Sequence, residues 1–318
     1  MAMQADQLAA AFTALPGVHV HRARDEADAV AHLAASDAAL LGGVQGAYTP
    51  ALAAAIAKSP RLAWVQLLST GMDAIEQHGL APHVQLTGIG ASGAIPVAEH
   101  AIALLLALAR QLPQWVRQGP QGSWDRSAAR HLRTLEGLRL AIAGTGGIGQ
   151  AAAQRARAFA MQVIGVNRSG SNPDPHLFDE VAQIRDLHAV LATCDALLIA
   201  LPLTAETRHL FNAPAWRAAK PGLLVVNVGR GALIDTPALL AELAAGQVGG
   251  AGLDVTDPEP LPPEHALWQH PNVLISPHVA GGGSPASLRR ICALVTDNLG
   301  RHTRGEPLLH PIKHGGAP

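Results

Sequence analysis

The sequence predicts an α/β fold with two doubly wound parallel-sheet domains. The chain has 318 residues, enough for about two domains at roughly 100–200 residues each. Two series of short apolar runs alternate with helix-prone segments, and a glycine-rich turn lies at the start of the second series. Hydrophobic residues make up 48% and charged residues 15%. This is a globular composition and excludes disorder for the bulk of the chain.

Charge and apolar pattern exclude several classes of partner. The formal net charge is −1 with 16 neutral histidines, and aromatic residues are 3%. Neither nucleic acid nor an anionic membrane surface is therefore expected as a partner. The longest apolar run, 101–109, is shorter than the about 20 residues that span a bilayer. No basic residue precedes Arg22, which argues against a secretory signal, so we expect a cytoplasmic protein.

The two cysteines are too few for a disulfide framework. Cys194 and Cys292 both lie in apolar stretches, so we expect them to be small core residues. We assign no metal ligands from the sequence.

In the first series, strands and helices alternate from residue 18 to residue 88. The expected strands are 18–21, 38–41, 62–68 and 84–88, and the expected helices are 25–36 and 51–58. The third strand ends at the turn Ser69-Thr70-Gly71. Such alternation is typical of βαβ units and a parallel sheet.

A long alanine- and leucine-rich helix, 96–110, and a Gly/Pro/Gln stretch, 118–122, separate the two series. Six apolar runs follow from residue 138: LRLAIAG, QVIGV, ALLIALP, LLVVNVG, GAGLDV and VLISPH. Several are rich in β-branched residues, which suits parallel strands buried on both faces. The second series therefore predicts a six-stranded doubly wound sheet, followed by a helix over 287–301 and a polar tail.

The turn LRLAIAGTGGIG contains G-x-G-x-x-G at Gly144, Gly146 and Gly149, between a strand and a helix-prone run. The first glycine permits a tight turn, the second lets the backbone approach a pyrophosphate, and the third allows close helix–strand packing. The helix N-terminus then faces the phosphate charge. The alternatives are an ordinary glycine turn and a methyltransferase that binds S-adenosylmethionine.

The next strand ends at Asn167-Arg168-Ser169. An NAD site expects an acidic residue about 20 positions after the glycine motif, to bind the ribose 2′-hydroxyl. Here the position is neutral, and Arg168 offers a guanidinium that suits a 2′-phosphate. The alternatives for Arg168 are a solvated loop residue and stacking on the adenine of NAD.

Three further strand exits carry candidate chemistry. Residues 227–231 bring an arginine, 254–260 bring three carboxylates, and 276–278 bring a histidine. Open α/β sheets place their sites at these carboxyl ends. An arginine binds a carboxylate bidentately, a histidine exchanges the hydroxyl proton, and a carboxylate beside it stabilises the imidazolium. Together they predict a site that reduces a carbonyl group.

Seven segments, in family order, resemble the D-isomer-specific 2-hydroxyacid dehydrogenases. They are STGMD (69–73), VAEHA (97–101), GTGGIG (144–149), LPLTAETRHLFN (201–212), NVGRGALID (227–235), LDVTDPEPLP (253–262) and HPNVLISPHVAGG (270–282). The resemblance covers essentially the whole chain.

The resemblance implies a catalytic trio of Arg230, Glu259 and His278. Glu259 stands just before the proline of the family's D-x-x-x-x-E-P pattern, so Asp254 is expected to order the loop and Asp257 is not favoured. Arg230 and the loop Ser69, Thr70, Gly71 and Met72 are implied to bind the substrate carboxylate. The implied cofactor-binding residues are Gly144, Thr145, Gly146, Gly147, Ile148, Gly149, Asn167, Arg168, Ser169, Leu201, Pro202, Thr207, Val228, Gly229, Asp254, His278 and Gly281.

The resemblance also implies the domain arrangement. Residues 1–97 and 285–318 form a smaller, flavodoxin-like substrate-binding domain, and 98–284 form a Rossmann NAD(P)-binding domain inserted into it. Catalysis is expected in the cleft between them. The family usually forms homodimers through the nucleotide domain. The run 101–109 and Trp115 fit that interface or an internal helix equally well.

The implied function is hydride transfer between NAD(P)H and a small 2-oxo acid, with glyoxylate and hydroxypyruvate as the expected substrates. The pattern at Asn167-Arg168 predicts NADP(H) as the preferred cofactor, with NAD(H) possible. Thr256 stands where many members have an aromatic residue, in a loop near the expected cleft. The alternatives are a phosphoglycerate dehydrogenase-like enzyme, disfavoured because no regulatory domain follows the last helix, and a non-enzymatic nucleotide sensor resembling a corepressor.

Overall fold

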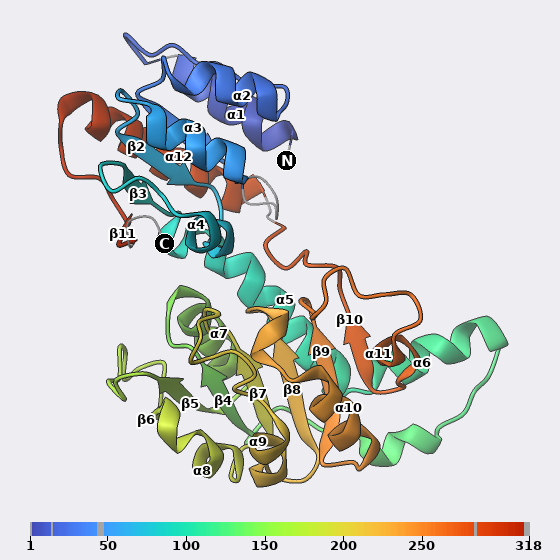
Figure 1. Ribbon diagram of the computed structural model, residues 1–318. Coiled ribbons are helices and arrows are strands. Elements are labelled where there is room, and N and C mark those ends of the chain that lie inside the picture. The colour runs from blue at the N-terminus through green and yellow to red at the C-terminus, as the bar shows by residue number, and fades with distance from the viewer. Residues whose placement is uncertain (1, 14, 43–47, 283–284, 315–318) are drawn as a thin grey trace. The chain divides into compact units, whose positions relative to one another are not determined.

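The computed structural model describes residues 2–13, 15–42, 48–282 and 285–314 (Figure 1). The chain forms two compact units. The smaller unit comprises Met1–Gly93 and Gly283–Pro318, and the larger unit comprises Ala94–Gly282. The chain first passes from the smaller to the larger unit after Gly93, four residues before the boundary expected after residue 97. The reason is that the helix Ala94–Ala109 belongs to the larger unit from its first turn. The second expected boundary, after residue 284, lies outside the described residues.

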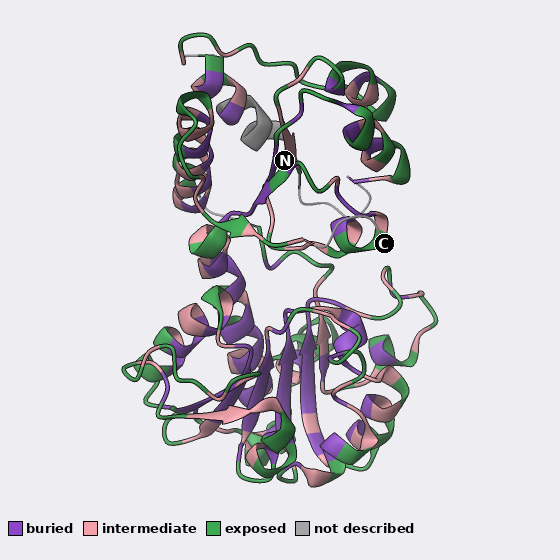
Figure 2. Ribbon diagram, turned by 60° about the vertical axis from the view of Figure 1, so that its left-hand side comes forward, coloured by how far each residue is buried: buried purple, intermediate pink, exposed green. Residues whose placement is uncertain are grey.

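The larger unit contains a seven-stranded, wholly parallel sheet in the order β10-β9-β8-β7-β4-β5-β6. Its strands are β4 (Arg139–Ala143), β5 (Gln162–Asn167), β6 (Glu180–Gln183), β7 (Ala196–Ile199), β8 (Leu223–Asn227), β9 (Val248–Leu253) and β10 (Val273–Ile275). The chain order reverses between β4 and β7, which is where doubly wound sheets bind ligands. Figure 2 shows the central strands in the colour of buried residues.

Helices cover both faces of this sheet because successive strand residues point to opposite sides. On one face Leu140 and Ile142 pack with α5 (Ala94–Ala109) and α7 (Gly147–Ala158). On the other, Ala141 and Ala143 pack with α8 (Leu187–Leu191), α9 (Ala213–Ala218) and α10 (Thr236–Ala244). The peripheral elements are α6 (Leu112–Gln118), α11 (Ala266–Gln269) and the 3₁₀ turns Gly119–Gln121, Ser127–His131, Ile184–Asp186 and Gly231–Leu233.

The smaller unit has a four-stranded sheet in the order β1-β2-β3-β11. Strands β1 (Ala38–Leu41), β2 (Trp64–Leu67) and β3 (Gln85–Thr87) are parallel, and the edge strand β11 (Pro311–Ile312) is antiparallel to β3. Its helices are α1 (Ala2–Thr13), α2 (Glu26–Leu33), α3 (Pro50–Lys58), α4 (Asp73–His78) and α12 (Pro285–Arg304), with a 3₁₀ turn at Gly90–Gly93. Two clusters of buried side chains, one on each face, show that this sheet is also covered on both sides.

The predicted α/β class with parallel sheets is therefore confirmed, with local corrections. No strand forms over 18–21, where His19, Val20 and His21 are exposed and no described strand pairs with them. The larger sheet has a seventh strand, β6, which the sequence did not predict because EVAQ is short, polar and half-buried at the sheet edge. Both cysteines are free. Cys194 is buried in the core, as expected, whereas Cys292 is only half-buried. Burial raises the pKa of the Cys194 thiol.

One helical stretch of the described chain, Gly90–Ala109, is long and apolar enough to cross a membrane by length and composition. The apolar run 101–109 is therefore only part of a longer apolar helical stretch. Most apolar side chains of α5, which forms the larger part of this stretch, are buried against α7, β8 and β9. The core helix of a globular unit meets the same criterion, so length and composition do not by themselves indicate a membrane span.

Candidate active site

The glycine turn lies at the carboxyl end of β4, the strand at which the sheet order reverses. Gly144 has φ +103°, and a Cβ there would lie 2.5 Å from the Ala200 carbonyl oxygen. A Cβ on Gly149 would lie 2.0 Å from the Gly144 carbonyl oxygen. At Gly146, the N-cap of α7, a Cβ would meet no atom within 4 Å. The first and third glycines are therefore needed for packing, and the second leaves open space above a helix N-terminus, which fits a dinucleotide pyrophosphate.

Asn167 joins this turn to the loop after β5. Its Nδ2 donates to Thr145 Oγ1 at 2.9 Å and to the Ser171 carbonyl at 2.9 Å, while its Oδ1 accepts from Gly170 N at 2.7 Å. Arg168, the next residue, is exposed, and no hydrogen bond or ion pair to it occurs within the described parts of the chain. The loop thus presents the Arg168 guanidinium beside the glycine turn, whereas the Asn167 side chain holds the loop and the turn together.

Arg230 leaves the sheet at the end of β8, in a turn built by buried Asn227. The Asn227 amide accepts from Gly229 N at 3.0 Å and donates to the Arg230 carbonyl at 2.9 Å. A Cβ on Gly231 would lie 1.9 Å from the Thr256 carbonyl oxygen, so this turn packs directly on the loop after β9. The arginine is half-buried, and its Nη1 also donates to the Gly229 carbonyl at 2.6 Å.

His278 and Glu259 form a hydrogen-bonded imidazole–carboxylate pair. Imidazole Nδ1 lies 2.6 Å from Glu259 Oε1. Since a carboxylate only accepts hydrogen bonds, Nδ1 carries the proton and Nε2 is the ring nitrogen left for a substrate. The backbone of His278 has φ +53°, a region that non-glycine residues seldom occupy. Its N–H donates to the Asp254 carbonyl at 2.8 Å, which helps to hold this conformation.

The carboxylate of Asp254 organises the loop that carries His278. Asp254 is buried at the end of β9, and its oxygens accept from Ser276 Oγ at 2.6 Å, Val279 N at 3.0 Å and Ala280 N at 3.0 Å. His100 of α5 lies 2.7 Å from Ser276 Oγ. Because the serine proton goes to the carboxylate, His100 Nε2 is the donor to the serine oxygen. Sequence reasoning expected the loop-ordering role of Asp254 but missed Ser276, His100 and Asn227.

The remaining predicted residues lie in four segments, three in the larger unit and one in the smaller unit. Leu201, Pro202 and Thr207 lie in the loop after β7, where the Thr207 hydroxyl donates to the Pro202 carbonyl at 2.8 Å and accepts from Thr204 N at 2.7 Å. Val228 and Gly229 belong to the Arg230 turn, and Gly281 follows the His278 loop. The turn Ser69, Thr70, Gly71 and Met72 lies in the smaller unit, between β2 and α4.

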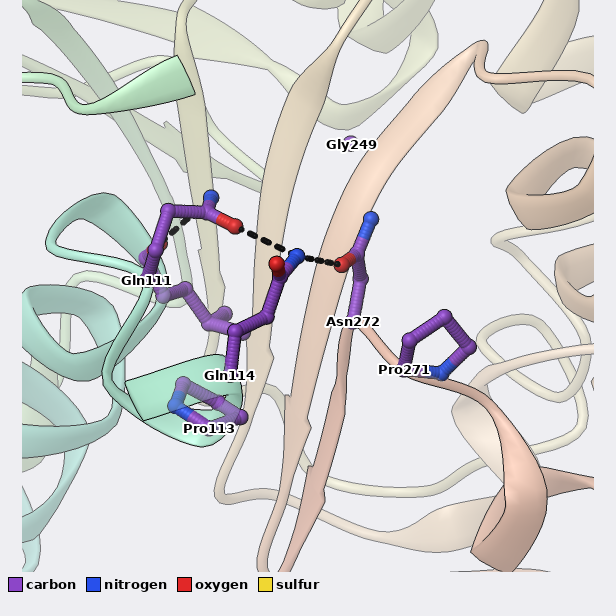
Figure 3. Close-up of a pocket in the computed structure, with 7 residues that line it drawn as sticks. Gln111, Pro113, Gln114, Gly249, Pro271 and Asn272 are labelled. Carbon is purple, nitrogen blue, oxygen red and sulfur yellow. Dashed lines mark hydrogen bonds between the residues drawn. The ribbon is translucent and has the colours of Figure 1, made fainter. Parts of the chain in front are cut away.

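A small pocket lies elsewhere in the larger unit, at the amino ends of β9 and β10 (Figure 3). Gln114 Nε2 donates to Gln111 Oε1 at 3.0 Å and to Asn272 Oδ1 at 3.3 Å across it. Its polar groups bond to one another, and it lies at the end of the strands opposite to the glycine turn, Arg230 and His278. We therefore do not assign the reaction to this pocket.

The carboxyl edge of the larger sheet thus brings together a phosphate-binding turn, an arginine and a histidine–glutamate pair. A guanidinium binds a carboxylate, and an imidazolium donates a proton to a carbonyl oxygen. This is the chemistry of an enzyme that reduces a 2-oxo acid with a dinucleotide.

Comparison with known proteins agrees with this chemistry. Residues 102–280 match the family description "D-isomer specific 2-hydroxyacid dehydrogenase, NAD binding domain". The hydroxyphenylpyruvate reductase of Plectranthus scutellarioides is 34% identical over 80% of this chain and 79% of its own length. The glyoxylate/hydroxypyruvate reductase B of Salmonella newport is 34% identical over 81% and 80%. A solved NADPH-dependent glyoxylate/hydroxypyruvate reductase of Sinorhizobium meliloti, in complex with NADP and sulfate, has TM-score 0.80 and 26% identity, covering 98% and 95%.

The chain belongs to the D-isomer specific 2-hydroxyacid dehydrogenase family. It is an oxidoreductase that transfers a hydride between a nicotinamide cofactor, NAD(P)H, and a small 2-oxo acid or D-2-hydroxy acid.

Proposed function

We propose that this protein is an NADPH-dependent reductase of glyoxylate and hydroxypyruvate. The observation that carries the cofactor preference is the end of β5. There Asn167 is used for structure, and the exposed Arg168, which has no hydrogen bond or ion pair within the described residues, follows it where an acidic residue would be expected for NAD. The substrate class is supported by the similarity to reductases of these two acids.

The nicotinamide cofactor, when bound, supplies the hydride that adds to C2 of the substrate. The turn 144–149 binds its pyrophosphate, and Arg168 with Ser169 binds the 2′-phosphate. Arg230 binds the substrate carboxylate through its guanidinium. His278 donates the Nε2 proton to the carbonyl oxygen, so the imidazolium becomes a neutral imidazole that keeps its Nδ1 proton toward Glu259. Glu259 stabilises the charged ring before transfer.

The function is tested with a panel of 2-oxo acids and both cofactors. The panel contains glyoxylate, hydroxypyruvate, hydroxyphenylpyruvate and 3-phosphohydroxypyruvate. We expect the highest kcat/KM for glyoxylate or hydroxypyruvate with NADPH. A higher value for either other acid overturns the substrate assignment, and a higher value with NADH overturns the cofactor assignment.

Arg168→Ala tests the cofactor assignment separately. A charge-assisted hydrogen bond contributes about 1.5–3 kcal/mol, and solvent screening of an exposed guanidinium favours the lower end. We therefore expect KM for NADPH to rise about tenfold, with KM for NADH little changed. Arg185→Ala is the matched control, because Arg185 is an exposed arginine in the 3₁₀ turn after β6. Equal effects of the two substitutions would contradict a role of Arg168 in phosphate binding.

We also propose a homodimer formed through the larger unit. The run 101–109 is mostly buried within that unit, but the segment after it exposes Leu112, Val116 and Trp124 at 46%, 73% and 92% of their surface. Exposed apolar side chains gathered on one segment favour association. A Val116→Glu, Trp124→Glu variant should elute as a monomer in size-exclusion chromatography with light scattering. A monomeric wild-type protein overturns the proposal. We propose, separately, that the protein is cytoplasmic and has no nucleic-acid or membrane partner.

A further inference from the structure

Two glycines of β9 let helix α5 pack directly on that strand (Figure 1). A Cβ on Gly252 would lie 2.9 Å from Leu104 Cβ, and a Cβ on Gly250 would lie 3.2 Å from Leu108 Cδ2. The first distance is shorter than the contacts that Cβ atoms make, so a side chain at Gly252 would push the helix away. The backbone of β9 therefore sets how closely α5 approaches.

The same register brings His100 to the carboxyl end of β9. His100 lies four residues before Leu104, one turn along the same face of α5. Asp254 lies two residues after Gly252, on the same side of the strand. The helix step advances about 6.0 Å and the strand step about 6.6 Å, so the two positions stay opposite each other. His100 Nε2 accordingly lies 3.4 Å from Asp254 Oδ1.

A chain of hydrogen bonds leads from His100 to the loop that carries His278. His100 Nε2 donates to Ser276 Oγ at 2.7 Å, and the serine hydroxyl donates to Asp254 Oδ1 at 2.6 Å. The carboxylate accepts, at 3.0 Å each, from the backbone N–H groups of the two residues directly after His278. The His100 side chain is 27% exposed and that of Asp254 is 2% exposed. The chain thus runs from a partly exposed imidazole to a buried carboxylate.

We propose that His100 is a positioning residue for His278, an inference that rests on the proposed role of His278 as the proton donor. The N–H of His100 fixes the orientation of the Ser276 hydroxyl, because the serine oxygen accepts this bond and the serine proton then points to Asp254. A neutral imidazole with its proton on Nε2 and an imidazolium both donate to the serine. The bond therefore holds the hydroxyl in either protonation state of His100.

The competing role of His100 is to fill space between α5 and the loop after β10. A leucine at this position keeps apolar bulk but has no donor, whereas a glutamine keeps an N–H donor on a side chain of similar reach. A space-filling residue affects the melting temperature. A positioning residue affects kcat and is replaced by the variant that keeps the donor.

Steady-state kinetics of His100→Leu and His100→Gln separate these two roles. We expect kcat of His100→Leu to fall about 2- to 12-fold, the equivalent of about 0.5–1.5 kcal/mol for one neutral hydrogen bond. The KM for the 2-oxo acid and the cofactor dissociation constant should change little, and His100→Gln should restore most of kcat. His188→Leu is the matched control, because His188 is an exposed histidine on α8, which covers the other face of the sheet. Its kcat should equal that of the wild type.

A double-mutant cycle tests whether His100 acts through Ser276. We expect His100→Leu to cause no further fall in kcat once Ser276→Ala is present, since the two side chains then no longer share a bond. The cycle is measured with the best substrate and cofactor of the panel, so it does not depend on glyoxylate or NADPH being that pair.

Three results overturn the proposal: wild-type kcat in His100→Leu, equal losses in His100→Leu and His100→Gln, or equal effects of His100→Leu with and without the Ser276 hydroxyl. A loss of melting temperature with unchanged kcat would make His100 a packing residue only. Near-normal turnover of His278→Ala, in contrast, contradicts the proposed function itself, so the two failures are distinguishable.

Discussion

Removal of the Ser276 hydroxyl tests how His278, the proposed proton donor, is held. Ser276 Oγ donates to Asp254 Oδ1 at 2.6 Å and accepts from His100 Nε2 at 2.7 Å. The same carboxylate accepts from Val279 and Ala280, directly after His278. Ser276→Ala therefore loosens the Asp254 carboxylate, which anchors the loop that carries His278, and leaves His278 itself unchanged.

The size of the expected fall in kcat follows from the loss of one hydrogen bond to the charged Asp254 carboxylate. Asp254 is 2% exposed, so water does not readily replace the serine. Such a bond contributes about 1.5–3 kcal/mol. If the whole loss appears as poorer positioning in the transition state, kcat falls roughly 10- to 150-fold, since about 1.4 kcal/mol is tenfold.

Ser276→Thr is the matched variant, because it keeps the hydroxyl and should restore most of kcat. The assay measures kcat and KM for glyoxylate, with the NADPH dissociation constant from fluorescence titration. We expect kcat to fall in Ser276→Ala with little change in NADPH binding. A Ser276→Ala enzyme with kcat within twofold of wild type refutes the positioning role. Loss of NADPH affinity in parallel with kcat would instead place Asp254 at the cofactor.

Three further predictions concern the trio and the glycine turn. His278→Ala removes the proposed proton donor and should lower kcat about 10²–10⁴-fold with NADPH binding retained, and near-normal turnover would exclude His278 as the acid. Arg230→Lys replaces a planar fork with a point charge and should raise KM for glyoxylate or lower kcat strongly, whereas unchanged kinetics would make Arg230 an ordinary structural residue. Gly149→Ala places a Cβ 2.0 Å from the Gly144 carbonyl oxygen and should lower the melting temperature without ligand. Gly146→Ala meets no atom within 4 Å and should melt normally but bind NADPH more weakly; equal melting temperatures for the two variants would contradict the assigned roles of these glycines.

Local patterns predicted the strands and turns that positioned the candidate site. The alternation of apolar runs predicted β4, β5 and β7 to β10 because strands buried on both faces leave continuous apolar segments in the sequence. The glycine spacing predicted the turn at Gly144, because only glycine avoids a clash with Ala200 there. The same reasoning failed at 18–21, where alternation without a pairing partner forms no strand.

Tertiary structure alone decided which polar side chains act together. Sequence order separates His100 from Ser276 by 176 residues, so no local pattern indicates that these two side chains act together. Asn167 likewise appeared only as a missing acidic residue, and the fold shows that its amide holds Thr145. The physical reason is that strand exits and helix faces are predictable from periodicity, whereas a hydrogen bond between two elements depends on sheet order and packing distance, which single-sequence patterns do not contain.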